Sequence, residues 1–251
     1  MSDTSDTTAS PSEWQEWVTY VGPLVAYMFL ASFIVAIWER VNIQLVASDS
    51  PQVALTVAWA RTLAIGAILI WGGKNLLRNF PFRFHFLSIW FGCVGAVLWI
   101  SICNLHLETK ILTTLGLSAD FLGSRESINP WDFFEGSIER ASFLFSRFSL
   151  LVIGVPFAEE LFLRGFLLRY VSDTDWTRVK LESLNWTAIL VTAVYGVLTH
   201  PSEWIAAAIW FSMVSVLMLR TKNLWDCIIA HSVTNGILGL YIILYQDWRL
   251  W

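Results

Sequence analysis

The stretch 156–169, PFAEELFLRGFLLR, places two adjacent carboxylates and an arginine inside an otherwise apolar run. At bilayer depth an ionised side chain costs about 2.5–3.5 kcal/mol, so such residues usually face the interior of a helix bundle or a wet cavity. Glu160 and Arg164 are four residues apart, lie on one face of a helix and can pair. Glu159 is rotated by about 100° from Glu160, and no cation follows it three or four residues later. We therefore predict that Glu160 is neutralised and that Glu159 is left for chemistry.

The overall composition is that of an integral membrane protein. Of the 251 residues, 56% are hydrophobic and 14% charged, and the mean hydropathy is +0.58. Soluble domains have about 45–50% apolar and about 25% charged residues. The net charge is −4, and no basic patch or nucleic-acid-reading motif is present, so we expect a lipid bilayer and no nucleic acid as partner. The first 16 residues contain no Lys or Arg, so we expect no cleavable signal peptide.

Apolar runs of about 20 residues, the length that a bilayer core requires, recur along the chain. We predict an all-α, polytopic membrane helix bundle with about seven transmembrane helices, with eight as the alternative count. The predicted spans are 18–38, 53–71, 86–105, 141–171, 186–200, 203–219 and 224–245. A polar N-terminal tail at 1–17 precedes them, and 18–251 is predicted to be a single transmembrane domain.

The fourth predicted span contains Pro156 and is long enough to be one kinked helix or two short ones. A single helix leaves most of the Lys and Arg residues of the loops on one side of the membrane, whereas two helices move several of them to the other side. The positive-inside rule therefore favours one kinked helix and predicts a cytoplasmic N-terminus.

A small set of polar side chains interrupts the later spans and can meet Glu159. His200 ends the span at 186–200, while His231 and Asn235 stand four residues apart on one face of the last span. A carboxylate and an imidazole can together activate a water molecule as general base. A second imidazole and an amide can donate hydrogen bonds to a developing oxyanion. This set is sufficient for amide hydrolysis without a covalent intermediate.

Other hydrolytic chemistries have weaker support in the sequence. There is no GxSxG motif for a serine nucleophile, and the three cysteines are scattered at unrelated spacings, which argues against a disulfide framework. Two histidines and a glutamate can in principle bind zinc, but HExxH is absent and asparagine is a poor ligand. We therefore expect no metal and no cofactor.

Two motifs resemble those of a known family. Glu159 and Glu160 followed by Arg164 are similar to the EExxxR motif of the CAAX-protease and bacteriocin-processing (CPBP, or Abi) family of intramembrane glutamate proteases. His231 and Asn235 are similar to its HxxxN motif. The resemblance covers about 142–245, and it implies that Glu160 and Arg164 hold the helix in place.

The third motif of that family, FxxxH, is matched with a shift. His200 is preceded at the expected aromatic position by Gly196, and Tyr195 stands one residue earlier. The resemblance implies that Glu159 and His200 activate water. It assigns His231 and Asn235 to the oxyanion site. The Trp225-Asp226 pair and the C-terminal WRLW resemble the subgroup associated with exosortase and PEP-CTERM sorting, so we expect a bacterial inner membrane.

Three functional hypotheses follow from these residues. The first is an intramembrane endopeptidase that resembles CAAX prenyl proteases and acts on a peptide or protein, either lipid-modified or membrane-anchored. The second is a non-catalytic membrane scaffold, immunity factor or processing partner, in which the polar cluster binds a peptide or packs helices. The third is a zinc metalloprotease that uses the same residues.

Overall fold

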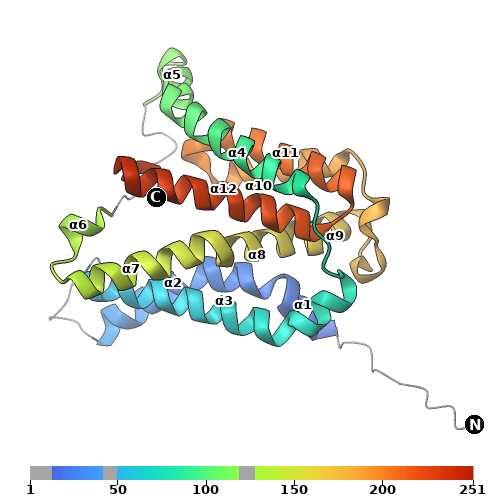
Figure 1. The fold of residues 1–251 in the computed structure, drawn as a ribbon, viewed down its shortest axis with the longest axis horizontal. Helices are drawn as coiled ribbons and strands as arrows, with labels where there is room; N and C mark the ends of the chain where they lie inside the picture. The colour runs from blue at the N-terminus through green and yellow to red at the C-terminus, as the bar shows by residue number, and fades with distance from the viewer. Residues whose placement is uncertain (1–12, 42–49, 119–127, 251) are drawn as a thin grey trace, which may run out of the picture.

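The described part of the chain is built from helices, as predicted. The computed structural model describes residues 13–41, 50–118 and 128–250, and these contain no strand (Figure 1). The α-helices are α1 (Glu13–Tyr20), α2 (Gly22–Val41), α3 (Pro51–Asn79), α4 (Phe86–Leu105), α5 (Leu107–Thr114), α6 (Pro130–Phe133), α7 (Ser137–Ser149), α8 (Val155–Glu160), α9 (Leu168–Ser172), α10 (Thr187–Thr199), α11 (Trp204–Thr221) and α12 (Leu224–Tyr245). The expected all-α, polytopic bundle is confirmed. Of the predicted polar tail, residues 1–12 lie outside the described ranges and residues 13–17 belong to α1.

Six helical segments of the described chain are long and apolar enough to cross a membrane, which makes this an integral membrane protein. They are Gly22–Arg40, Pro51–Asn79, Phe86–Thr114, Ser137–Ser172, Pro201–Thr221 and Leu224–Tyr245. The remaining predicted span is present as α10, which is apolar but has only 13 residues. At about 1.5 Å per residue it rises about 20 Å, less than the ~30 Å of a bilayer core. Pro201 follows directly and disfavours helical geometry at His200, so α10 ends there.

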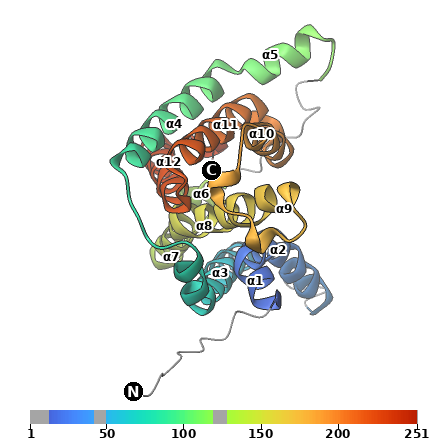
Figure 2. The ribbon, with the colours of Figure 1, turned by 90° about the vertical axis from the view of Figure 1, so that its right-hand side faces the viewer.

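The helices form two groups on either side of one long central helix. Ser137–Ser172 is continuous and comprises α7, α8 and α9 joined by π-helical turns at Leu150–Gly154 and Leu161–Leu167. Figures 1 and 2 show α2 and α3 on one side of it and α4, α10, α11 and α12 on the other. The central helix therefore contributes side chains to the interfaces of both groups.

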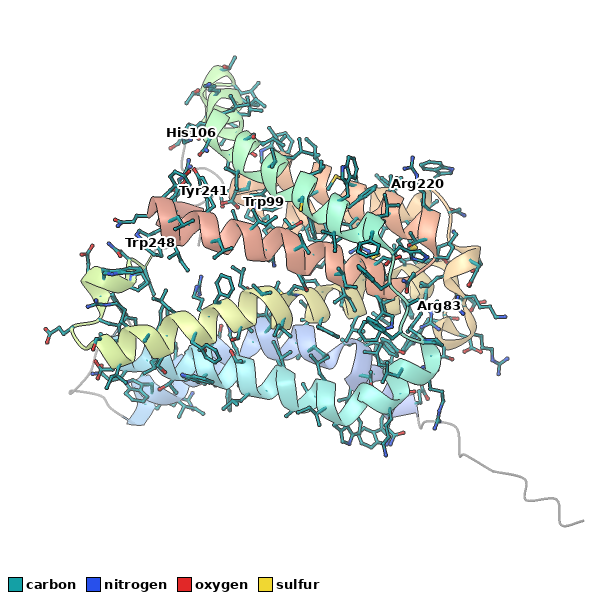
Figure 3. The ribbon with its side chains drawn as sticks, in the orientation of Figure 1. Arg83, Trp99, His106, Arg220, Tyr241 and Trp248 are labelled. Atoms are coloured by element: carbon teal, nitrogen blue, oxygen red, sulfur yellow. The ribbon has the colours of Figure 1, made fainter. Side chains whose placement is uncertain are left out.

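The two ends of the bundle differ in character. Figure 3 shows Arg83 and Arg220 at one end, and His106, Tyr241 and Trp248 at the other. Helix α1 lies at the same end as Arg83 (Figure 1). This arrangement agrees with the predicted topology, in which the N-terminus and the loops that contain Arg83 and Arg220 share a side. That this side faces the cytoplasm of a bacterial inner membrane stays a prediction.

The kink in the central helix is stabilised from outside that helix. The N–H of Val155 donates to the Leu150 carbonyl, five residues back. In this register the next carbonyl, that of Leu151, would receive an N–H from residue 156, which is a proline and has none. The Asn235 side chain of α12 instead donates from Nδ2 to the Leu151 carbonyl at 2.9 Å. Asn235 therefore satisfies the carbonyl that Pro156 leaves unpaired and ties α12 to the kink.

Helices α4 and α12 pack closely at a glycine. A Cβ atom at Gly92 would lie 2.6 Å from Val233 Cβ and 2.7 Å from the Ala230 carbonyl oxygen. We expect Gly92→Ala to destabilise the fold by about 1–3 kcal/mol, because overpacking here forces two backbones apart. Gly66→Ala in α3 is the matched control, since a Cβ there meets nothing within 4 Å. Equal thermal stability of both variants in detergent micelles would contradict the close packing.

Candidate active site

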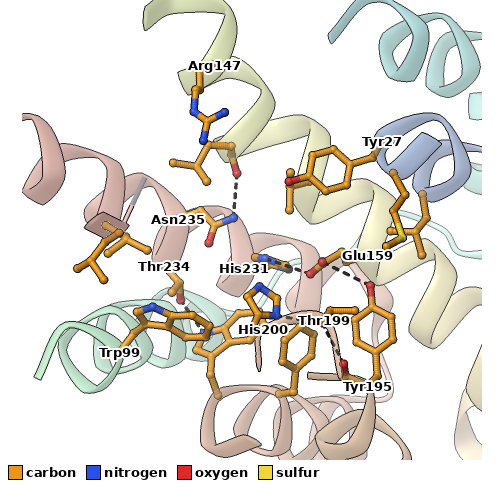
Figure 4. A pocket seen from close by; sticks show the side chains of 18 residues that line it. Tyr27, Trp99, Arg147, Glu159, Tyr195, Thr199, His200, His231, Thr234 and Asn235 are labelled. Carbon is orange, nitrogen blue, oxygen red and sulfur yellow. Dashed lines mark hydrogen bonds and ion pairs between the residues drawn. The ribbon is translucent and has the colours of Figure 1, made fainter. Parts of the chain in front are cut away.

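The four residues predicted to be catalytic line one cavity. Glu159 lies at the end of α8, His200 follows α10, and His231 and Asn235 lie one turn apart on α12. All four border a cavity of about 340 Å³ (Figure 4). The fold therefore brings together side chains that are up to 76 residues apart in the sequence, between 159 and 235.

Next to the cavity lies a buried network of charged groups. Glu160 and Arg164 are fully buried, and their Oε2 and Nη1 atoms are 2.8 Å apart. The other Glu160 oxygen, Oε1, lies 3.0 Å from His231 Nδ1. Arg164 also donates from Nη2 to Ser215 Oγ at 3.2 Å and to the Phe211 carbonyl at 3.4 Å. These contacts link the central helix to both α11 and α12.

Glu159 faces the cavity, in contrast to Glu160. It is only 5% exposed. Its Oε2 atom lies 3.8 Å from His231 Nε2, and its Oε1 atom accepts a hydrogen bond from the Tyr195 hydroxyl at 3.4 Å. The two neighbouring carboxylates thus have different surroundings, as the 100° angle between them on a helix predicts.

His200 is held in place by its neighbour Thr199 and by aromatic rings. The Thr199 hydroxyl lies 2.9 Å from His200 Nδ1 and 2.9 Å from the Tyr195 carbonyl oxygen. The rings of Trp99 and Phe211 lie 5.5 and 5.8 Å from the imidazole. These contacts fix the ring at the border of the cavity.

The shifted FxxxH motif has a structural explanation. A Cβ atom at Gly196 would lie 2.5 Å from Cδ2 of Phe211. The Phe211 ring of α11 therefore occupies the space that a large side chain at 196 would need, and it packs beside His200. An aromatic ring is present next to the histidine, but it comes from another helix. Sequence spacing alone gives no signal for such a replacement.

Several further residues complete the cavity. Arg147 borders it from α7, and Leu24, Tyr27 and Met28 border it from α2. Trp210 packs against His231 with ring centroids 4.4 Å apart. The sequence gives no signal that these residues share a site, apart from the mixed polar and apolar character of their helices. Which faces of the helices meet is decided only by tertiary packing. The apolar walls favour apolar groups of a ligand.

The described side chains provide few suitable ligands for a metal ion. Among the described residues, no group of three His, Cys, Asp or Glu side chains is arranged to hold one. Glu160 is already paired with Arg164, whose positive charge opposes a cation at that carboxylate. Cys93 and Cys227 form no disulfide bond.

Comparison with known proteins identifies the part of the chain that contains the motifs. Residues 141–237 match a family model named Rce1-like, whose description is "type II CAAX prenyl endopeptidase Rce1-like". No curated protein and no solved structure matches the chain. The match includes all six predicted site and support residues and confirms the resemblance to the CAAX proteases. The assignment to an exosortase-associated subgroup stays a prediction.

Proposed function

We propose, on the premise that residues 141–237 form an Rce1-like domain, that this protein is an intramembrane endopeptidase that hydrolyses a peptide bond without a metal ion. The observation that supports this most strongly is the shared cavity of one carboxylate, two imidazoles and one amide. Each of these groups has a role in amide hydrolysis, and they come from three separate helical segments. Packing alone gives no reason for them to converge.

Glu159 and His200 form the water-activating side of the site. Glu159 and His200 both border the cavity, and a carboxylate and an imidazole can both accept a proton. A water molecule placed between them loses a proton as its oxygen attacks the peptide carbonyl carbon. The C–N bond then breaks, and the proton passes to the departing amine nitrogen.

His231 is suited to stabilise the oxyanion. The buried cluster holds two carboxylates, Glu159 and Glu160, against one guanidinium, that of Arg164. His231 Nδ1 lies 3.0 Å from Glu160 Oε1, and this contact fixes the orientation of the ring. The ring also borders the cavity, where an N–H at Nε2 can donate to the negative charge that the tetrahedral intermediate develops.

Asn235 supplies the second oxyanion donor. An amide nitrogen has two N–H groups, and one of them donates to the Leu151 carbonyl. This bond fixes the orientation of the side chain. The second N–H is left for the oxyanion, so the same asparagine both stabilises the helix kink and serves the reaction.

The proposed substrate is a peptide or protein segment that reaches the cavity from the membrane, either lipid-modified or membrane-anchored. Leu24, Met28 and Leu238 give the cavity apolar walls that suit apolar side chains. A single transmembrane domain at 18–251 around this site completes the proposal.

Cleavage of a membrane-anchored peptide library by the purified protein in lipid vesicles tests this function. We expect cleavage that persists in the presence of a metal chelator, because the side chains of the cavity provide both base and oxyanion donors. Loss of cleavage on chelation, with recovery on adding zinc, would instead support the metalloprotease. No cleavage by the folded wild-type protein would support the non-catalytic role.

A further inference from the structure

We infer that Tyr195 is a positioning residue for the Glu159 carboxylate, an inference that rests on the endopeptidase function proposed above. The Tyr195 hydroxyl donates to Glu159 Oε1 at 3.4 Å, and both residues line the same cavity (Figure 4). The other oxygen, Oε2, lies on the side of His231. By holding Oε1, the phenol fixes the orientation of the carboxylate that accepts the proton of the attacking water. Such hydrogen bonds are commonly long before substrate binds and tighten afterwards.

The ring of Tyr195 is fixed on both sides. Its centroid lies 5.9 Å from that of Phe162 and 5.4 Å from that of Phe211. Phe162 comes three residues after Glu159 on the central helix. Its contact with Tyr195 therefore also links α10 to the segment that contains Glu159, the proposed general base. The hydroxyl is therefore delivered to Glu159 by a side chain with little freedom to move.

Tyr195 also connects to the second half of the water-activating pair. Its backbone carbonyl accepts a hydrogen bond from Thr199 Oγ1 at 2.9 Å, and the same hydroxyl lies 2.9 Å from His200 Nδ1. One residue thus contacts Glu159 through its side chain and His200 through Thr199. Its position sets how the carboxylate and the imidazole face each other.

The hydrogen bond between Tyr195 and Glu159 explains why the aromatic residue of the FxxxH motif stands one position earlier in this chain. The space beside position 196 is filled by Phe211, so an aromatic residue there would collide. One residue earlier on α10 the direction changes by about 100°. There the side chain meets Glu159, and a tyrosine adds a hydroxyl that a phenylalanine would lack.

Other charged groups also act on Glu159. His231, His200 and Arg147 line the same cavity, and Glu160 and Arg164 belong to the buried network beside it. A test must therefore change the phenol alone. Tyr195→Phe does so, because it keeps the ring that packs between Phe162 and Phe211 and removes only the hydroxyl.

We expect Tyr195→Phe to lower kcat/KM by about 10- to 100-fold, chiefly through kcat, because a hydrogen bond to a charged group is lost. The acid limb of the pH profile of kcat/KM should move to higher pH, since the ionised carboxylate loses a donor that stabilises it. Tyr27→Phe is the matched control: it removes a phenol from the same cavity and should leave the position of the acid limb unchanged.

A second measurement uses 3,5-difluorotyrosine at position 195, which keeps the ring and makes the hydroxyl a stronger donor. The acid limb should then move to lower pH. An acid limb that stays in place in both variants, while Glu159→Gln is inactive, would overturn the role of Tyr195 and leave the endopeptidase intact. If Glu159→Gln retains activity, the endopeptidase mechanism fails, and the role of Tyr195 fails with it.

Discussion

Replacing Glu159 by glutamine is expected to reduce peptide hydrolysis by about 10³-fold, within the 10²- to 10⁴-fold range of general base catalysis. Glutamine has nearly the shape of glutamate, and its carbonyl oxygen can still accept the hydrogen bond that Tyr195 donates to Oε1. What it lacks is the ability to take a proton from water. The loss should therefore appear in kcat, measured with the protein in lipid vesicles, while the amount of folded protein is unchanged.

The matched control for this variant is Glu139→Gln. Glu139 is an exposed carboxylate on α7, which belongs to the same continuous helix as Glu159. The substitution removes the same charge outside the cavity, so we expect activity equal to that of the unmodified protein. Full activity of Glu159→Gln in the same vesicles would show that another group activates water, and the proposed mechanism would be abandoned.

The local part of the site is predictable from the sequence. Glu160 pairs with Arg164, and His231 shares a face with Asn235, because residues four apart on a helix are neighbours whatever the rest of the fold does. The apolar runs likewise predict the helices, since a bilayer core fixes their length. Both kinds of inference use only the geometry of a single helix.

Contacts between helices are not predictable in this way. The sequence predicts that Glu160 pairs with Arg164 but not that its second oxygen meets His231, which is 71 residues away. It gives no sign that Phe211 fills the space beside Gly196. These contacts depend on which faces of different helices pack together, and that choice follows from the shapes of many side chains at once.

The length of α10 shows a second limit of prediction from the sequence. The run 186–200 is apolar enough for a span, but the helix occupies only Thr187–Thr199. Hydropathy measures how apolar a segment is and does not measure the depth at which it sits. The end of α10 at Thr199 places His200 at the border of the cavity, beside Trp99.

Replacing Arg164 by methionine is expected to destabilise the fold by about 3–5 kcal/mol, the usual cost of removing one partner from a buried ion pair. Glu160 would remain fully buried without its guanidinium, and the Phe211 carbonyl and Ser215 would each lose one hydrogen bond. The exposed pair of Arg178 and Asp175 provides the control, because Arg178→Met removes an arginine that water already solvates. Unfolding of both variants in mixed detergent, followed by circular dichroism, gives the comparison.

A double variant, Glu160→Gln with Arg164→Met, separates the loss of charge balance from the loss of packing. It leaves no uncompensated carboxylate at position 160, so part of the stability lost in Arg164→Met should return. Its activity should stay low, because His231 loses the carboxylate that holds Nδ1 and orients the ring. If the double variant is no more stable than Arg164→Met, the ion pair is not the reason why this arginine stabilises the bundle. In that case the hydrogen bonds from Arg164 to α11 would account for most of its stabilising effect.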